Sequence, residues 1–180
     1  MARRDPAASA EFVAARSRSL HRAAYLMVGD TQLAQDLVQE ALTKTYVAWP
    51  RLCDPRAAEA YTRKAITTTA ISWFRRKGWA NERPTETLPD PGRPGHADDI
   101  ARNDWLWTAL QTLPARQRAA IVLRFYDDLT EAQTADAMGC AVGTVKSQVS
   151  AGLAKLRKQL EATGAGDAEL LPLELMVVTR

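Results

Sequence analysis

Two stretches of the chain combine basic side chains with groups that contact nucleic-acid bases. AYTRKAITTTAISWFRRKGW, residues 60–79, places five lysines and arginines beside Trp73, Phe74 and Trp79. Aromatic rings stack on unpaired bases while basic side chains hold phosphates, a combination typical of single-strand binding. GCAVGTVKSQVSAGLAKLRK, residues 139–158, joins short polar side chains to a basic end, which suits a duplex major groove. Both stretches therefore indicate binding to a polyanion.

The charge distribution supports a polyanionic partner more than the net charge of +3 does. Residues 1–81 hold 13 lysines and arginines against 7 acids, and residues 105–163 hold 7 against 5. Residues 82–104 hold 3 against 6, and residues 164–180 hold 1 against 3. Two basic blocks separated by an acidic segment are compatible with nucleic-acid binding, and also with solvated helix faces.

Residues that usually perform catalysis or hold metal are sparse. His21 and His96 are the only histidines, and Cys53 and Cys140 stand far apart without a CxxC pattern. The sequence has no GxSxG, P-loop or HExxH motif, so it predicts no enzyme, no cofactor and no metal site. No apolar run reaches the ~20 residues of a membrane span, and MARRDPAASAEF lacks the apolar core of a secretion signal. The chain is expected to be cytoplasmic, without a membrane segment.

The hydrophobic pattern predicts an all-α protein with two small helical domains. Hydrophobic residues make up 46% of the chain and charged residues 25%, a composition that can form a core. Residues 82–98, ERPTETLPDPGRPGHAD, hold four prolines and two glycines without periodicity, which is typical of a flexible linker. Helical spacing occurs on both sides of it. The predicted parts are a flexible N-terminus 1–10, a first domain 11–80, a linker 81–99, a second domain 100–163 and a tail 164–180.

The first domain is expected to hold three or four helices. Gly29 and Asp30 are predicted to end one helix and open the next, and Pro50 is predicted to end the second. A further helix is expected from about Ala57 to Lys77. The side chains expected in the core recur at helical spacing. They are Phe12, Ala15, Leu20, Ala23, Ala24, Met27, Leu33, Leu37, Ala41 and Thr45.

The second domain shows the pattern of a helix-turn-helix. Thr130 and Gln133 form a capping box that opens a short helix, and Gly139 is expected to end it. The next helix has an apolar stripe predicted to face the core and a polar face left outside. This pattern fits a DNA reader, and it also fits an ordinary helical hairpin. The stripe is Val142, Val145, Val149, Leu153, Leu156 and Leu160, and the polar face is Thr144, Lys146, Ser147, Gln148, Ser150 and Lys155.

Both domains resemble regions of one known family. GDTQLAQDLVQEALTKTYVAW, with AYTRKAITTTAISWFRRK, resembles region 2 of the extracytoplasmic-function sigma factors, group IV of the sigma-70 family. LPARQRAAIVLRFYDDLTEAQTADAMGCAVGTVKSQVSAGLAKLR resembles their region 4. The likeness spans residues 11–160 in the family's order and extends to the actinobacterial sigma-E-like group. It implies a transcription initiation factor that binds core RNA polymerase and recognises the −35 and −10 elements of promoter DNA.

The resemblance also implies protein partners. The helix with Asp36-Leu-Val-Gln-Glu40 corresponds to the surface that docks on the β′ clamp helices of core RNA polymerase, whose β subunit is a further expected contact. Glu40 and Lys44 can also pair along the helix, which contributes ~0.2–0.5 kcal/mol. Because family members are often held by an anti-sigma protein, such a partner is expected too. The residues placed on the polymerase surface are Asp36, Gln39, Glu40 and Lys44.

The resemblance assigns the basic and aromatic stretch to the melted −10 element. The loop from Arg51 to Arg56 corresponds to the place where the family holds a flipped-out base, a step that costs a few kcal/mol. Trp73 and Phe74 are open to two interpretations, core packing or base stacking. Thr68 stands where many members carry Asn, which leaves the −10 preference open. The implied −10 contacts are Arg51, Arg56, Arg63, Lys64, Thr67, Thr68, Ser72, Arg75, Arg76 and Lys77.

The helix from Val142 to Lys158 corresponds to the reader of the −35 element. It departs from the family at Ala141, which has no capping side chain, and at Gln148, where Arg is frequent. It departs again at Ala151-Gly152, where a mid-helix glycine costs about 1 kcal/mol relative to alanine. The implied −35 contacts are Thr144, Lys146, Ser147, Gln148, Ser150, Lys155 and Arg157.

These departures keep other functions open. One is a sigma-like adaptor that binds polymerase without reading DNA, and another is a regulator that uses only the C-terminal helix-turn-helix. On the helix before the helix-turn-helix, Arg116, Arg118 and Arg124 are expected either to contact phosphate or to be solvated.

Overall fold

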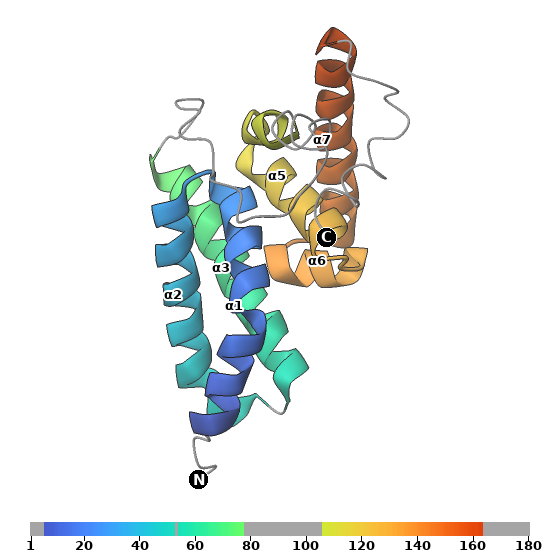
Figure 1. The fold of residues 1–180 in the computed structure, drawn as a ribbon. Coiled ribbons are helices and arrows are strands. Elements are labelled where there is room, and N and C mark those ends of the chain that lie inside the picture. The colour runs from blue at the N-terminus through green and yellow to red at the C-terminus, as the bar shows by residue number, and fades with distance from the viewer. Residues whose placement is uncertain (1–5, 53, 78–105, 164–180) are drawn as a thin grey trace.

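The computed structural model describes residues 6–52, 54–77 and 106–163, and every regular element in these ranges is helical. The predicted all-α fold class is therefore confirmed. The predicted linker, the C-terminal tail, Cys53, Trp79 and His96 lie outside the described residues. Figure 1 shows the first three helices running side by side, with the second group of helices packed against one side of them.

The first block consists of three helices, which agrees with the expected number. Asp30 caps the second helix, because its carboxylate accepts a hydrogen bond from the Leu33 N–H at 2.8 Å. Gly29 ends the first helix with a φ of +78°, the left-handed conformation that favours glycine. The helices are α1 (Pro6–Val28), α2 (Thr31–Ala48) and α3 (Pro55–Lys77), with a 3₁₀ turn η1 (Trp49–Arg51) after α2.

The predicted apolar stripes of the first block form its core, with one exception. Leu20, Ala24 and Leu37 are almost completely buried, and Leu33 packs against the core while remaining partly exposed. The expectation that Ala15 lies in the core is wrong, because it lies on the exposed side of α1. One methyl group gives α1 little reason to turn that side inward, since burying a CH₂-sized group is worth only ≈ 0.8 kcal/mol.

The second block contains the predicted helix-turn-helix. The capping box is present, with the Gln133 N–H donating to Thr130 at 3.2 Å and the Thr130 N–H donating to Gln133 at 2.8 Å. Gly139 ends the short helix with a φ of +62°. The elements are a helical segment 106–111, α5 (Ala115–Ile121), a π-helical turn η2 (Val122–Tyr126), α6 (Glu131–Met138) and α7 (Val142–Thr163).

The apolar stripe of α7 faces the core from Val145 onward. Val145, Leu156 and Leu160 are buried. The prediction that Val142 also faces the core is wrong, because 38% of it is exposed. It is the first residue of α7, and the preceding turn leaves it at the surface.

Gly152 explains the unusual small residue in the middle of α7. It is buried, and a Cβ atom added there would lie 2.5 Å from the Cδ1 atom of Ile121 on α5. The same added atom would lie 3.5 Å from the Cβ atom of Gln117. The glycine therefore allows α5 and α7 to approach closely. This close packing is obtained at the expense of the helix propensity that alanine would provide at position 152.

The two blocks share one hydrophobic core, which the sequence did not predict. α6 packs against α3, and α5 and η2 contact α1 (Figure 1). The stacked rings of Tyr25 and Trp107 join the blocks, with ring centroids 4.3 Å apart. Buried residues of both blocks belong to one continuous cluster. The side chains predicted to bind nucleic acid must therefore be located relative to this shared interface.

Candidate nucleic-acid interface

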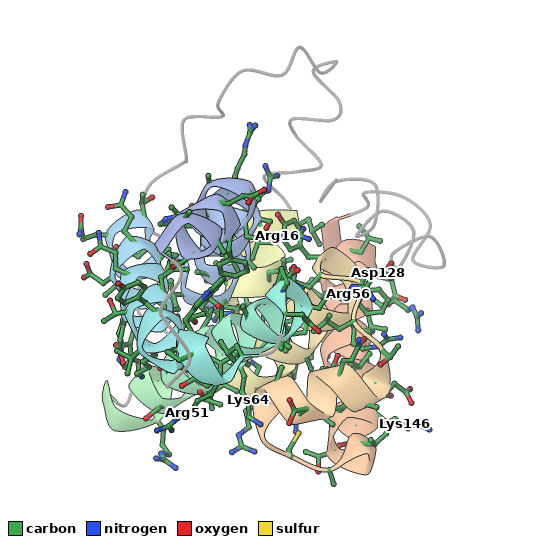
Figure 2. All side chains as sticks on the ribbon, turned by 90° about the horizontal axis from the view of Figure 1, so that it is seen from below. Arg16, Arg51, Arg56, Lys64, Asp128 and Lys146 are labelled. Atoms are coloured by element: carbon green, nitrogen blue, oxygen red, sulfur yellow. The ribbon has the colours of Figure 1, made fainter. Side chains whose placement is uncertain are left out.

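The outer face of α7 presents the short polar residues that are predicted to read a duplex. Lys146, Ser147 and Ser150 are exposed, whereas Thr144 and Gln148 are half-buried. Lys146 contacts Glu131 on α6 at 3.5 Å, an exposed ion pair of little energetic weight. Of the other predicted contacts on this helix, Lys155 and Arg157 are also exposed. Because the stripe beneath is buried, α7 holds this face outward, and Figure 2 shows Lys146 at the outer edge of the second block.

Beside that face, η2 and α7 form a groove of about 320 Å³. Phe125, Val149 and Leu153 supply its apolar walls, and this explains why the two α7 residues remain partly exposed. Arg124 lies at the groove and donates a hydrogen bond to the Leu129 carbonyl oxygen.

On α3, Arg63 is held by acids from both blocks. Its Nη1 atom lies 2.9 Å from Glu59 Oε1 one turn earlier on the same helix. Its Nη2 donates to Asp127 Oδ1 at 3.2 Å, and its Nε lies 3.1 Å from Asp127 Oδ2, without the alignment of a hydrogen bond. Arg16 of α1 contacts the other Glu59 oxygen at 3.3 Å. The guanidinium predicted to hold −10 phosphate is thus paired with carboxylates.

Lys64 is paired in the same way at the edge of this interface. Its Nζ atom donates to Asp136 Oδ1 of α6 at 2.7 Å. Both side chains are substantially exposed, at 45% and 68%. Figure 2 shows Lys64 beside the helices of the second block. Sequence reasoning missed Asp127 and Asp136, because nothing local marks an acid as the partner of a cation more than 60 residues away.

The Asp127 carboxyl is buried at an energetic cost. Only 2% of its side chain is exposed. Burial raises the pKa of Asp127 from 3.8 to about 6, although Arg63 acts in the opposite direction, and Glu59 adds a smaller upward effect. Removal from water therefore outweighs the attraction of the guanidinium in this pair.

The remaining predicted −10 contacts divide into exposed and covered residues. Thr67 is fully buried and its hydroxyl has no hydrogen-bond partner, so the expectation that it touches DNA is not met in this arrangement of the blocks. Thr68 is exposed and donates to the Lys64 carbonyl oxygen at 2.7 Å. Ser72 is half-buried. The side chains of Arg76 and Lys77 lie outside the described residues, and the other exposed members are Arg51, Arg56 and Arg75.

Trp73 and Phe74 both pack against the shared core. The guanidinium of Arg118 lies 5.2 Å from the centroid of the Phe74 ring, a cation–π distance. Of the two interpretations given for these rings, core packing is the one this arrangement supports.

Arg118 joins the two blocks. It is buried, so the expectation that it is solvated or contacts phosphate is wrong. It donates to the Met27 carbonyl oxygen at 2.8 Å and to the Gln111 side chain at 2.6 Å, and Gln111 donates to the Leu26 carbonyl oxygen at 3.3 Å. Both carbonyl groups belong to the last turn of α1, where the carbonyl oxygens have no hydrogen-bond donor within their own helix. Desolvation lowers the pKa of Arg118 to about 10, which leaves it charged at neutral pH.

A different exposed surface lies on α2. Asp36, Gln39, Glu40 and Lys44 are all exposed, and Lys44 contacts Glu40 at 2.6 Å as expected. Two large apolar side chains that sequence reasoning missed, Tyr46 and Val47, are 40% and 62% exposed. They follow Gln39 and Glu40 by seven residues each, and this spacing places them on the same helix face. The exposed face of α2 therefore combines charged, polar and apolar side chains.

Within the described residues, no three His, Cys, Asp or Glu side chains come together as a metal site would require. Among the described helices, none combines the length and the apolar character needed to cross a membrane.

Comparison with known proteins gives consistent matches over both blocks. Residues 12–80 match the family model for sigma-70 region 2, and residues 103–156 match the model for sigma-70, region 4. The RNA polymerase sigma-E factors of Streptomyces avermitilis and Streptomyces coelicolor are each 38% identical over 152 residues, covering 84% of this chain and 84% and 85% of theirs. The sigma factor SigV of Bacillus subtilis is 28% identical over 145 residues, covering 79% of this chain and 85% of its own.

A solved structure also shares the fold. It is the sigma factor RpoE of Bartonella quintana, crystallised in complex with the anti-sigma factor NepR. The TM-score is 0.66 at 23% sequence identity, and the match covers 84% of this chain and 96% of the other.

Proposed function

Because the chain belongs to the sigma-70 family of RNA polymerase sigma factors, we propose that it directs promoter-specific initiation through three of its own surfaces. The observation that supports this most is the outward polar face of α7 on a chain that also carries region 2. The proposed division is region 2 over residues 11–80 and region 4 over residues 100–163, joined by the linker. The protein performs no chemistry of its own in this proposal, acts in the cytoplasm and is held by an anti-sigma partner.

The surface proposed for core polymerase is the outer face of α2. Asp36, Gln39, Glu40 and Lys44 supply its polar groups, and Val47 adds an apolar contact. Charged groups of this kind fix register and partner choice, while the apolar side chain contributes affinity by burial. A matched pair of variants tests this. Asp36→Arg is expected to weaken core binding at least ~10-fold, whereas Gln35→Arg, at the neighbouring exposed position, is expected to leave it unchanged.

The surface proposed for the −35 element is the N-terminal half of α7. Lys146 and Gln148 lie within the part of this helix that would enter a major groove, and short hydroxyl side chains flank them. Gly152 has a packing role, so its presence gives no reason to infer a helix that has lost DNA contacts. Of the departures that motivated the adaptor alternative, packing accounts for Gly152, while those at Ala141 and Gln148 stay as they were.

The surface proposed for the −10 element is α3 with the preceding loop. Arg51 and Arg56 flank the loop that would hold a flipped-out base, and Arg63, Lys64, Thr68 and Arg75 follow along the helix. Basic residues spaced along a helix can follow a strand's phosphates.

Run-off transcription tests the whole proposal. Core RNA polymerase free of other sigma factors is supplied with the protein and a promoter library randomised at the −35 and −10 positions, and transcript 5′ ends are sequenced. A defined pair of elements is expected to be enriched. The double variant Lys146→Ala/Gln148→Ala is expected to relax the −35 preference alone, and Glu161→Ala at the other end of α7 serves as control. Core binding without initiation, or an unchanged −35 preference in the double variant, contradicts the assignment.

A further inference from the structure

The groove between η2 and α7 has apolar walls that the described helices leave partly uncovered. Phe125, Val149 and Leu153 line it and are only partly buried, whereas Val145 beneath them is fully buried. Phe125 belongs to the π-helical turn, a distortion of the helix that is frequent at functional sites. The volume of about 320 Å³ lies at the small end of the ~300–1,000 Å³ typical of binding pockets. The groove can therefore take a few side chains of a docked segment.

The charged residues of this groove are mainly basic. Arg124 and Lys146 line it together with one acid, Glu131. Lys146 and Glu131 approach to 3.5 Å with both side chains exposed, and an exposed ion pair of this kind holds Lys146 only weakly. The groove therefore suits an apolar segment that also carries acidic groups.

The C-terminal part of this chain has that composition. Residues 170–178, LLPLELMVV, hold seven apolar side chains besides Pro172, and one acid, Glu174. Over residues 164–180 the acids outnumber the bases by 3 to 1. Pro172 disfavours a helical conformation at the residue before it and favours an extended backbone there. The sequence thus supplies an acidic tail with an apolar, extended-type segment inside it.

The spacing of the tail's leucines matches the length of the groove. In an extended segment Leu171, Leu173 and Leu175 lie on the same side, because successive side chains alternate. They cover ~13 Å from first to last at the rise of a strand. Val145 and Leu153, the outermost apolar residues that α7 contributes to the groove, are ~12 Å apart along the helix axis. Three leucines can therefore follow the apolar side of the groove.

The tail also starts within reach of the groove. α7 ends at Thr163, which lies ~15 Å beyond Leu153 along the helix axis. Residues 164–170 can span up to ~23 Å when extended. Leu171 can therefore lie beside Leu153, with the following residues running back along α7.

We propose that residues 170–178 dock into the groove between η2 and α7 of the same chain. The three leucines contact Phe125, Val149 and Leu153, and the acids of the tail lie toward the basic rim. Docking is driven by the removal of apolar surface from water on both sides. It uses only the tail and the groove, so it does not depend on the −35 role proposed for α7.

Photo-cross-linking tests where the tail lies. The photoreactive residue p-benzoylphenylalanine is incorporated at position 176 of the 180-residue chain, which leaves the three leucines in place, and the products of irradiation are identified by mass spectrometry. Cross-links within one chain to residues 124–125 or 145–153 are expected. Cross-links between two chains, cross-links to residues outside the groove, or the absence of any cross-link overturn the proposal.

Proteolysis tests whether the groove holds the tail. Chymotrypsin cleaves after leucine and methionine, and its rate of cleavage within residues 170–176 follows the undocked population when docking is fast. Leu153→Glu places a carboxylate among the apolar side chains of the groove. It is expected to raise this rate at least ~10-fold over Ala154→Glu, because burial of one leucine side chain changes the docked population by about tenfold or more. Ala154 is the matched control, since it is exposed and does not line the groove.

Circular dichroism of each variant separates loss of docking from loss of the fold. If Leu153→Glu does not fold, Ser150→Glu against Ser147→Glu decides. Both serines are exposed on α7, and Ser150 lines the groove whereas Ser147 does not. A carboxylate at position 150 meets the acidic tail at the rim, so a cleavage rate about threefold above the control is expected. Equal cleavage rates within the deciding pair overturn the proposal.

Discussion

α3 and α7 carry similar chemistry and differ in whether the fold leaves it accessible. Both are long helices with basic and hydroxyl side chains suited to nucleic acid. On α7 the apolar stripe is buried and Lys146, Ser147 and Ser150 point outward. On α3 the central cation, Arg63, belongs to the buried side of the helix and is paired with Asp127 of the other block. The types of these residues are similar on the two helices, whereas tertiary packing decides which of their side chains are accessible.

The largest effect is expected at Arg118, which joins the two blocks. Arg118→Met removes the donors to Met27, Gln111 and Leu113, leaving buried carbonyl groups unpaired. A loss of about 3 kcal/mol or more in the free energy of unfolding is expected, because each unsatisfied group costs about 1–3 kcal/mol. Urea denaturation measures it. Arg116→Met, on the same helix and exposed, is expected to change stability by less than about 0.5 kcal/mol.

A pH-dependent effect is expected at the covered side of α3. The folded protein holds the Asp127 proton more tightly than the unfolded chain, so the neutral carboxyl contributes stability that is fully present below pH 3.8 and is lost as the pH rises through about 6. Across that window the wild-type protein is expected to lose at most about 3 kcal/mol relative to Asp127→Asn, because each pKa unit corresponds to 1.36 kcal/mol.

The measurement is the free energy of unfolding of both proteins at several pH values. Arg63 and Glu59 face the same carboxyl and are unchanged in the variant. Asp128→Asn is the control, since Asp128 is exposed and its positive φ of 52° suits asparagine. A constant difference between the wild-type protein and Asp127→Asn from pH 4 to pH 7 contradicts the expectation.

On α7, a smaller effect is expected from its exposed cation. Lys146→Ala is expected to weaken holoenzyme binding to promoter duplex by about 1 kcal/mol and to reduce the slope of log K against log salt by about 1, as for one lost phosphate contact. Titrations at several salt concentrations measure both quantities, with Glu161→Ala as a neutral control. An unchanged salt slope means that Lys146 makes no contact with phosphate.

The smallest effect is the difference in stability expected between alanine substitutions at two glycines of α7. A Cβ atom added at Gly143 would meet open space, so Gly143→Ala is expected to stabilise the fold by at most about 1 kcal/mol through helix propensity. Gly152→Ala gains the same propensity and must displace the buried Ile121 side chain, so it is expected to be less stable than Gly143→Ala. Thermal unfolding compares them, and equal melting temperatures contradict the packing role of Gly152.

Local features were predictable because their causes lie within a few residues. The capping box at Thr130, the break at Gly29 and Asp30, and most of the α7 stripe follow from short-range spacing. Arg118, Asp127 and the close contact at Gly152 could not be predicted in this way. Each depends on a partner that packing brings near. The separation in the sequence is 31 residues for Gly152 and Ile121, and 91 residues for Arg118 and Met27. Residues with roles set by distant partners look like ordinary surface or helix-breaking residues in the sequence.

The close approach at Gly152 also limits how the promoter preference of this chain can be engineered. Retargeting a recognition helix usually means placing new side chains along its length, but position 152 has no room for one while Ile121 occupies its present place. Useful libraries would therefore vary residues 144–150 and keep Gly152 constant. A second route is to shorten residue 121 first, for example with Ile121→Val, and then to explore position 152 in that background.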